Sequence, residues 1–275
     1  MPTRTCTIEV PGGRLHAVAD GEGPPILLVH AGIADLRAWD ALVPLLVDAG
    51  YRAIRYDCRG FGRSTTEDVD YSNRADLVAV LDAFDVGRAV LVGNSRGAII
   101  SLDTLVERPD RVAGLVWVGG GISGYDAPLR TDEEALFTRM EAIEEAGDPD
   151  AIADIDVAVW VDGFNQPAGR APAAIREAVR EMDRALYEPG RINGRPIPLD
   201  PPADERLGEI RVPVVAVLGG LDVPNIEHAA ARLEAEVAGA RTVVVPDVGH
   251  MAGMEAPERL AGIIAELARS IGSWG

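Results

Sequence analysis

The chain has 275 residues, of which 47% are hydrophobic and 25% are charged, a composition that excludes disordered and collagen-like proteins. Its 26 basic and 44 acidic residues give a formal net charge of −18, which disfavours nucleic acid as a partner because phosphates are repelled. No apolar stretch reaches the ~18 residues that a membrane helix needs.

Apolar runs of strand length alternate with helix-period segments over the first 120 residues. The expected strands are 5–10, 14–19, 26–30, 51–56, 89–92 and 112–118, the first two forming a hairpin. The expected helices are 35–47, 73–84 and 96–107. This alternation favours a mostly parallel sheet with helices on both faces.

The alternation stops between residues 121 and 210. This segment has no convincing strand but three amphipathic helical patterns, followed by a linker rich in proline and glycine over 189–202. Strands at 212–218 and 242–245 and helices at 226–237 and 257–271 then resume the pattern. We therefore expect a core of residues 1–120 and 211–275 that carries a helical insertion, 121–210.

A nucleophile motif follows the strand 89–92. Gly93-Asn94-Ser95-Arg96-Gly97 has the form G-x-S-x-G and lies between a strand and a helix, the context that defines a nucleophile elbow. The turn is so sharp that a Cβ at position 93 or 97 would collide with neighbouring backbone. The motif predicts Ser95 as a nucleophile in a strained conformation.

A serine hydroxyl needs a base to remove its proton, and the chain has four histidines. His250 lies in a loop after the strand 242–245, at the edge of an open α/β sheet where ligands bind. It is the predicted base. Structural roles are expected for the other three, His16, His30 and His228, with a hydrogen-bonding role for His30 at the end of its strand.

The base needs a carboxylate to orient its ring. Asp222 follows a core strand and precedes His250, which gives the order Ser95, Asp222, His250 of this kind of site. Asp247, three residues before the histidine, is the local competitor. Asp57 also follows a core strand, but its loop is expected to brace neighbouring turns through Arg59 and Ser64.

An acyl-transfer intermediate needs two N–H donors for its oxyanion. The first is expected from Arg96, the residue after the nucleophile, and the second from Gly32 in preference to Ile33. The Arg96 side chain has two readings: an ion pair with a nearby carboxylate, or an anchor for an anionic substrate.

These motifs resemble the α/β-hydrolase superfamily over nearly the whole chain outside the insertion. The matching segments are 30–32, 57–64, 93–97, 219–222, 249–251 and 255–258. The resemblance implies an α/β-hydrolase fold with an eight-stranded sheet and a helical cap, and it implies no metal or organic cofactor. The chain departs from the family at Ala31, where a glycine is usual, and at Arg96, where an apolar residue is usual.

Within the superfamily the chain looks like the group of esterases, enol-lactonases and meta-cleavage C–C hydrolases. It differs from haloalkane dehalogenases and epoxide hydrolases, which have an aspartate where this chain has Ser95. The expected activity is therefore hydrolysis of a small ester or lactone. C–C hydrolysis of a vinylogous diketone, suggested by Asn94, and a ligand receptor with slow turnover are the alternatives.

The remaining expectations concern the protein's surroundings. The N-terminal residues MPTRTCTIEV contain no apolar signal core, which predicts a cytoplasmic protein with a small-molecule substrate and no membrane partner. Two cysteines are too few for a disulfide framework and lack the spacing of a zinc site. The sequence does not predict an oligomeric state, and the acidity is compatible with simple solubility or with adaptation to high salt.

Overall fold

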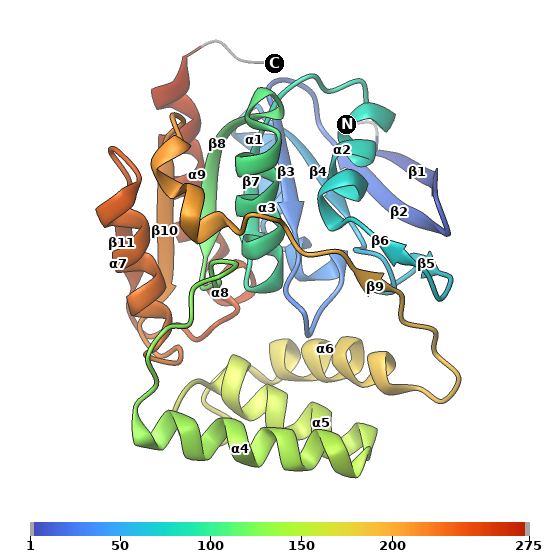
Figure 1. Ribbon diagram of the computed structural model, residues 1–275, viewed down its shortest axis with the longest axis vertical. Coiled ribbons are helices and arrows are strands. Elements are labelled where there is room, and N and C mark those ends of the chain that lie inside the picture. Colours follow the sequence, from blue (N-terminus) through green and yellow to red (C-terminus); the bar gives the residue numbers. More distant parts are fainter. Residues whose placement is uncertain (1–2, 273–275) are drawn as a thin grey trace.

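A twisted sheet forms the centre of the molecule in the computed structural model, which describes residues 3–272 (Figure 1). Its strands are β1 (Thr3–Val10), β2 (Gly13–Asp20), β3 (Pro25–Val29), β4 (Arg52–Tyr56), β5 (Thr65–Thr66), β7 (Ala89–Asn94), β8 (Val112–Val118), β10 (Val214–Gly219) and β11 (Arg241–Val245). Eight of them run in the order β1-β2-β4-β3-β7-β8-β10-β11, and β5 pairs with β2. The pairs β1–β2 and β2–β4 are antiparallel and those from β4 to β11 are parallel, which confirms the predicted mostly parallel sheet.

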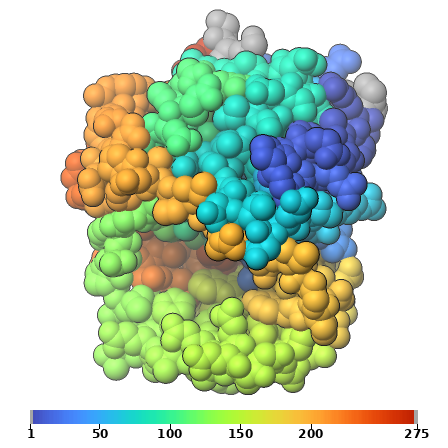
Figure 2. Space-filling view, turned by 45° about the vertical axis from the view of Figure 1, so that its right-hand side comes forward, coloured from blue at the N-terminus to red at the C-terminus, as the bar shows by residue number. Residues whose placement is uncertain are grey.

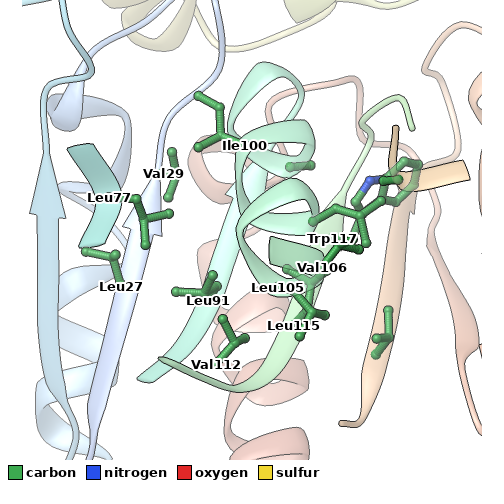
Figure 3. Packing of buried hydrophobic residues seen from close by; sticks show 14 of the residues in the cluster. Leu27, Val29, Leu77, Leu91, Ile100, Leu105, Val106, Val112, Leu115 and Trp117 are labelled. Atoms are coloured by element: carbon green, nitrogen blue, oxygen red, sulfur yellow. The ribbon is translucent and has the colours of Figure 1, made fainter. Parts of the chain in front are cut away.

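Helices cover both faces of this sheet. The helices α2 (Asn73–Ala83), α3 (Arg96–Glu107) and α7 (Ile226–Glu236) pack on one face, and α1 (Val43–Asp48) and α9 (Pro257–Ile271) on the other. In β3, Leu27 and Val29 face α2 and α3 (Figure 3), whereas Ile26 and Leu28 face α1 and α9. Because both faces are buried, the strands read as continuous apolar runs. No helix within residues 3–272 combines the length and apolar content needed to cross a membrane.

A separate layer of helices lies beyond the carboxyl ends of the parallel strands (Figure 1). This helical layer, residues 131–187, contains α4 (Thr131–Ala146), α5 (Pro149–Asp156), a π-helix (Val157–Asp162), α6 (Ala173–Arg184) and a 3₁₀ turn (Ala185–Tyr187). The predicted apolar face of α6 packs inward, as the buried Val179 and Met182 show, whereas the apolar residues predicted on α4 are only partly buried. Figure 2 shows the molecule hollowed between the helical layer and the sheet.

Two expectations about the elements were wrong. The single helix expected over 35–47 is a 3₁₀ turn (Leu36–Trp39) followed by α1, because Pro44 fits only the first turn of a helix. The segment 121–210 also contains a strand, β9 (Arg195–Pro196), which pairs with β6 (Asp70–Tyr71). A two-residue strand is too short to show a hydrophobic period. Short elements that the sequence did not indicate include β5, β6, the 3₁₀ turns Pro109–Arg111, Ala185–Tyr187 and Ala203–Glu209, and the helix α8 (Ala252–Glu255).

Candidate active site

Ser95 forms the whole turn between a strand and a helix. β7 ends at Asn94 and α3 begins at Arg96, so the backbone must reverse at the serine. Its φ of 55° and ψ of −117° lie where side chains with a Cβ are rarely found. The Ser95 N–H donates to the Val118 carbonyl over 2.8 Å, which ties the turn to the end of the neighbouring strand β8.

The glycines on either side of Ser95 allow close backbone contact. A Cβ at Gly93 would lie 2.2 Å from the Gly97 carbonyl oxygen, and a Cβ at Gly97 would lie 2.1 Å from the Val29 carbonyl oxygen. Both distances are far below any ordinary contact, and both neighbours are backbone atoms. The crossing of β7, α3 and β3 therefore requires glycine at both positions, as the sequence motif predicts.

Gly97→Ala is expected to destabilise the protein and to disturb the serine turn, because its new Cβ can be placed only by moving the backbone of β3. Overpacking of this kind costs about 1–3 kcal/mol, or roughly 3–10 °C in Tm. Gly262→Ala, in α9 with open space around it, is the matched control and should not lower Tm. Thermal unfolding of both variants tests the expectation, and equal melting temperatures would contradict it.

His250 and Asp222 form a buried pair beside the serine turn. His250 Nδ1 lies 2.7 Å from Asp222 Oδ2, and the other carboxylate oxygen accepts the Val223 N–H over 2.7 Å. The two competitors are placed elsewhere. Within residues 3–272 the Asp247 side chain makes no hydrogen bond or ion pair with the histidine ring, and Asp57 accepts the backbone N–H groups of residues 36 and 63.

The backbone of His250 is held from two further sides. Asn94 Nδ2 donates to the His250 carbonyl over 3.1 Å, so the residue before Ser95 also fixes the histidine loop. From the helical layer, the Trp160 carbonyl accepts the His250 N–H over 3.1 Å, and the two rings lie 4.8 Å apart. Sequence reasoning assigned neither role: Asn94 suggested only a subgroup of the family, and nothing in the sequence connected Trp160 with His250.

Arg170 adds a second link between the helical layer and the histidine loop. Its guanidinium donates to the carbonyls of Asp162 at 2.7 Å and Asp247 at 3.0 Å, and it pairs with Glu255. Glu255 in turn accepts the Gly249 N–H over 2.9 Å. The loop that presents His250 is thus anchored in both parts of the molecule. No local sequence signal marks Arg170 for this role.

A cleft of about 470 Å³ opens next to these residues. Ser95 and His250 line it from the sheet, Phe137 and Trp160 from the helical layer, and Asn225 from the start of α7. The cleft combines apolar walls with a few polar groups, which is typical of a site for a small organic molecule. Within the described chain, no group of three or more His, Cys, Asp or Glu side chains is arranged to hold a metal ion.

The predicted oxyanion donors lie close together. A Cβ on Gly32 would be 3.7 Å from Arg96 Cβ, so the loop after β3 faces the start of α3. The backbone N–H groups of Gly32, Ile33 and Arg96 donate to no acceptor within residues 3–272. Free N–H groups are expected at a helix N-terminus such as Arg96 and are available to an anion.

The Arg96 side chain is not part of the lining of this cleft. Its Nη2 donates to Asn73 Oδ1 over 3.1 Å, and its guanidinium carbon lies 4.8 Å from the centre of the Phe61 ring. No carboxylate pairs with it in the part of the chain that is described. The ion pair considered from the sequence is therefore replaced by an amide and an aromatic face.

The other predicted supporting residues have structural partners. His30 Nδ1 lies 2.7 Å from the Ala31 carbonyl oxygen, and its Nε2 accepts the Cys58 N–H over 2.9 Å, so both ring nitrogens are hydrogen-bonded. Arg59 pairs with Asp76, with 2.7 Å between Nη2 and Oδ1. Ser64 donates to the Asp57 carbonyl over 2.6 Å. This loop therefore braces the turns around it.

Comparisons with known proteins agree with this architecture. The model of the alpha/beta hydrolase family matches residues 26–263. Epoxide hydrolase B of Mycobacterium tuberculosis is 35% identical over 122 residues, a match that covers 41% of this chain and about a third (34%) of that protein's length. Rhodomycin D methylesterase DauP of Streptomyces sp. (strain C5) is 28% identical, covering 98% of this chain and 99% of that protein. The malate-bound structure of a thermophilic esterase from Thermogutta terrifontis superposes with a TM-score of 0.74 at 25% identity, covering 98% of this chain and 100% of that one.

Proposed function

Because this chain belongs to the alpha/beta hydrolase family, we propose that it is a serine hydrolase that cleaves a small carboxylic ester or lactone. The observation that carries the proposal is the buried 2.7 Å contact between His250 Nδ1 and Asp222 Oδ2 beside the strained Ser95. In this proposal residues 121–210 form a cap over a core of residues 1–120 and 211–275, and the cleft between them binds the substrate.

In the first half of the proposed reaction, Ser95 Oγ attacks the carbonyl carbon while His250 Nε2 takes the hydroxyl proton. Asp222 holds Nδ1–H and stabilises the imidazolium that forms. The N–H groups of Arg96 and Gly32 stabilise the negative oxygen of the tetrahedral intermediate. The intermediate collapses to an acyl-enzyme, and His250 gives the proton to the leaving alkoxide.

In the second half, His250 removes a proton from water, and the hydroxide formed attacks the acyl carbon. The same N–H groups hold the second tetrahedral oxyanion, and the proton returns from His250 to Ser95 Oγ as the acid leaves. This sequence uses only side chains and backbone of the chain itself, and it involves no cofactor.

The relatives support ester chemistry more than epoxide opening. The methylesterase matches nearly the full length of this chain, whereas the epoxide hydrolase matches cover 41% and 64% of it. An epoxide hydrolase of this family attacks with an aspartate, and a carboxylate nucleophile forms an ester that water can cleave. A serine would form an ether with an opened epoxide, which water does not readily hydrolyse. Ser95 therefore favours acyl transfer.

A substrate panel tests the proposal. Purified protein should release p-nitrophenol from p-nitrophenyl acetate steadily over many turnovers, and Ser95→Ala should not. The panel also contains a δ-lactone, a vinylogous diketone and styrene oxide. A stoichiometric burst that stalls would favour the receptor alternative, cleavage of the diketone alone would favour C–C hydrolysis, and turnover of the epoxide alone would contradict acyl transfer.

A further inference from the structure

Trp160 connects the helical layer to the proposed base through two contacts. Its ring lies 4.8 Å from the His250 ring at an angle of 47°, and its carbonyl oxygen accepts the His250 N–H over 3.1 Å. The indole also stacks on Phe137 of α4, with 6.3 Å between ring centres. Any movement of Trp160 therefore changes its contacts with His250.

The indole N–H of Trp160 is held by a buried carboxylate. Trp160 Nε1 donates to Asp156 Oδ1 over 3.0 Å, one helical turn earlier. Asp156 is 7% exposed, so this hydrogen bond is shielded from water. The position of the indole over His250 thus depends on where the Asp156 carboxylate lies.

A second carboxylate, Asp183 of α6, lies against Asp156. Asp183 is fully buried, and neither of its oxygens accepts a hydrogen bond from any donor in the described residues other than a protonated Asp156. The other titratable groups that face the pair are Glu144 from α4 and Tyr187 from the 3₁₀ turn after α6, and neither is a cation. The nearby arginines, Arg180 and Arg184, bind Asp150 and Asp154 instead.

Two buried carboxylates without a cation retain a proton between them. Burial, and next the charge of Asp156, raises the pKa of Asp183 to about 8. Burial also raises the pKa of Asp156 to about 6, although hydrogen bonds from Asp183 and Trp160 oppose this increase. At pH 7 the pair therefore holds one proton, which bonds one carboxyl group to the other.

We propose that the proton shared by Asp156 and Asp183 positions Trp160, and through it His250, so that loss of this proton in alkaline solution lowers hydrolysis. The predicted loss of hydrolysis rests on the proposed serine hydrolase function. When both carboxylates are ionised they repel each other, and no neighbouring cation compensates. Asp156 then moves away from Asp183 and takes the indole with it, which withdraws the Trp160 ring from the His250 ring.

The same proton links pH to stability, and Asp183→Asn should show it. The folded chain retains a proton that an unfolded aspartate releases above about pH 4. Its stabilising effect is complete below that pH and is lost as the pH rises through about 8. An asparagine donates an N–H to Asp156 at every pH. Asp183→Asn should therefore melt roughly 5 °C or more above wild type at pH 9, with a smaller difference at pH 5.

The kinetic test compares rates at pH 7 and pH 9 on p-nitrophenyl acetate, corrected for spontaneous hydrolysis. A single group with a pKa of about 8 leaves about a tenth of the molecules protonated at pH 9, so kcat/KM of wild type should fall about tenfold. In Asp183→Asn the ratio of the two rates should stay near one. The control is Asp154→Asn, an exposed carboxylate on α5, which should behave as wild type.

Tryptophan fluorescence provides a readout that needs no turnover. Wild type and Asp154→Asn should show an emission change with a midpoint near pH 8, and Asp183→Asn and Trp160→Phe should lack it. If this change appears but no ester is hydrolysed, the proposed link between the acid pair and Trp160 is supported and the serine hydrolase proposal fails. If esters are hydrolysed but neither rate nor emission changes near pH 8, the acid-pair proposal is overturned.

Discussion

Replacing Ser95 by alanine is expected to lower kcat/KM for an ester by about 10⁴ to 10⁶, because the groups of a serine–histidine–aspartate site act as a unit. Without Oγ there is no atom to carry the acyl group, and only the N–H donors and the binding cleft remain to assist water. The turn itself should tolerate the change, since the Ser95 side chain makes no hydrogen bond that supports the fold within residues 3–272.

Covalent labelling with a fluorophosphonate, read by mass spectrometry, complements the rate measurement. The probe should modify Ser95 in wild type and nothing in Ser95→Ala, because only an activated hydroxyl attacks phosphorus. Ser270→Ala, in α9, removes a serine whose hydroxyl donates to a helix carbonyl, and it should label as wild type does. Retention of most activity in Ser95→Ala would show that another group is the nucleophile.

Asp222→Asn is expected to lower kcat by about 10⁴ with little change in stability. An asparagine can turn its NH₂ toward His250 Nδ1, which forces the ring proton onto Nε2. The nitrogen that should accept the Ser95 proton would then carry one itself. The amide oxygen can still accept the Val223 N–H, the hydrogen bond that Asp222 makes in the folded chain, so the loop should keep its shape.

Asp247→Asn is the matched control for Asp222→Asn. It changes the same chemical group in the His250 loop, and its φ of 60° suits asparagine well. Its kcat should stay within about threefold of wild type, and circular dichroism should show both variants folded. If Asp247→Asn were the inactive variant and Asp222→Asn the active one, the carboxylate that orients His250 would have to be reassigned.

Strands and helices with a strong local pattern could be predicted from the sequence almost to the residue. β8 and α9 have the predicted ends because no contact distant in sequence is needed to define them. β8 is an unbroken apolar run, and α9 begins at a proline and keeps one apolar face. The elbow was equally predictable, because the motif itself spans five residues and the contact that requires Gly93 lies within it, although the contact that requires Gly97 comes from Val29 of β3.

Other features depend on partners distant in sequence and leave no local pattern. The strand β9 exists because its two residues meet β6, more than a hundred positions earlier. Asn94 and Trp160 act on His250 through hydrogen bonds that span 156 and 90 positions, and any asparagine or tryptophan would look the same in the sequence. The Asp156–Asp183 pair is likewise invisible until α5 and α6 are packed together.

The attachment of the His250 loop to the helical layer limits which helical segments can be exchanged in an engineered chimera. Trp160 and Arg170 supply partners for three groups in or next to that loop, the Asp247 carbonyl, the His250 N–H and the Glu255 carboxylate, and they do so from outside the sheet. Grafting the helical segment of another hydrolase onto this core would therefore remove part of the support of the histidine itself. A working chimera would have to import compatible partners for this loop along with the new substrate pocket.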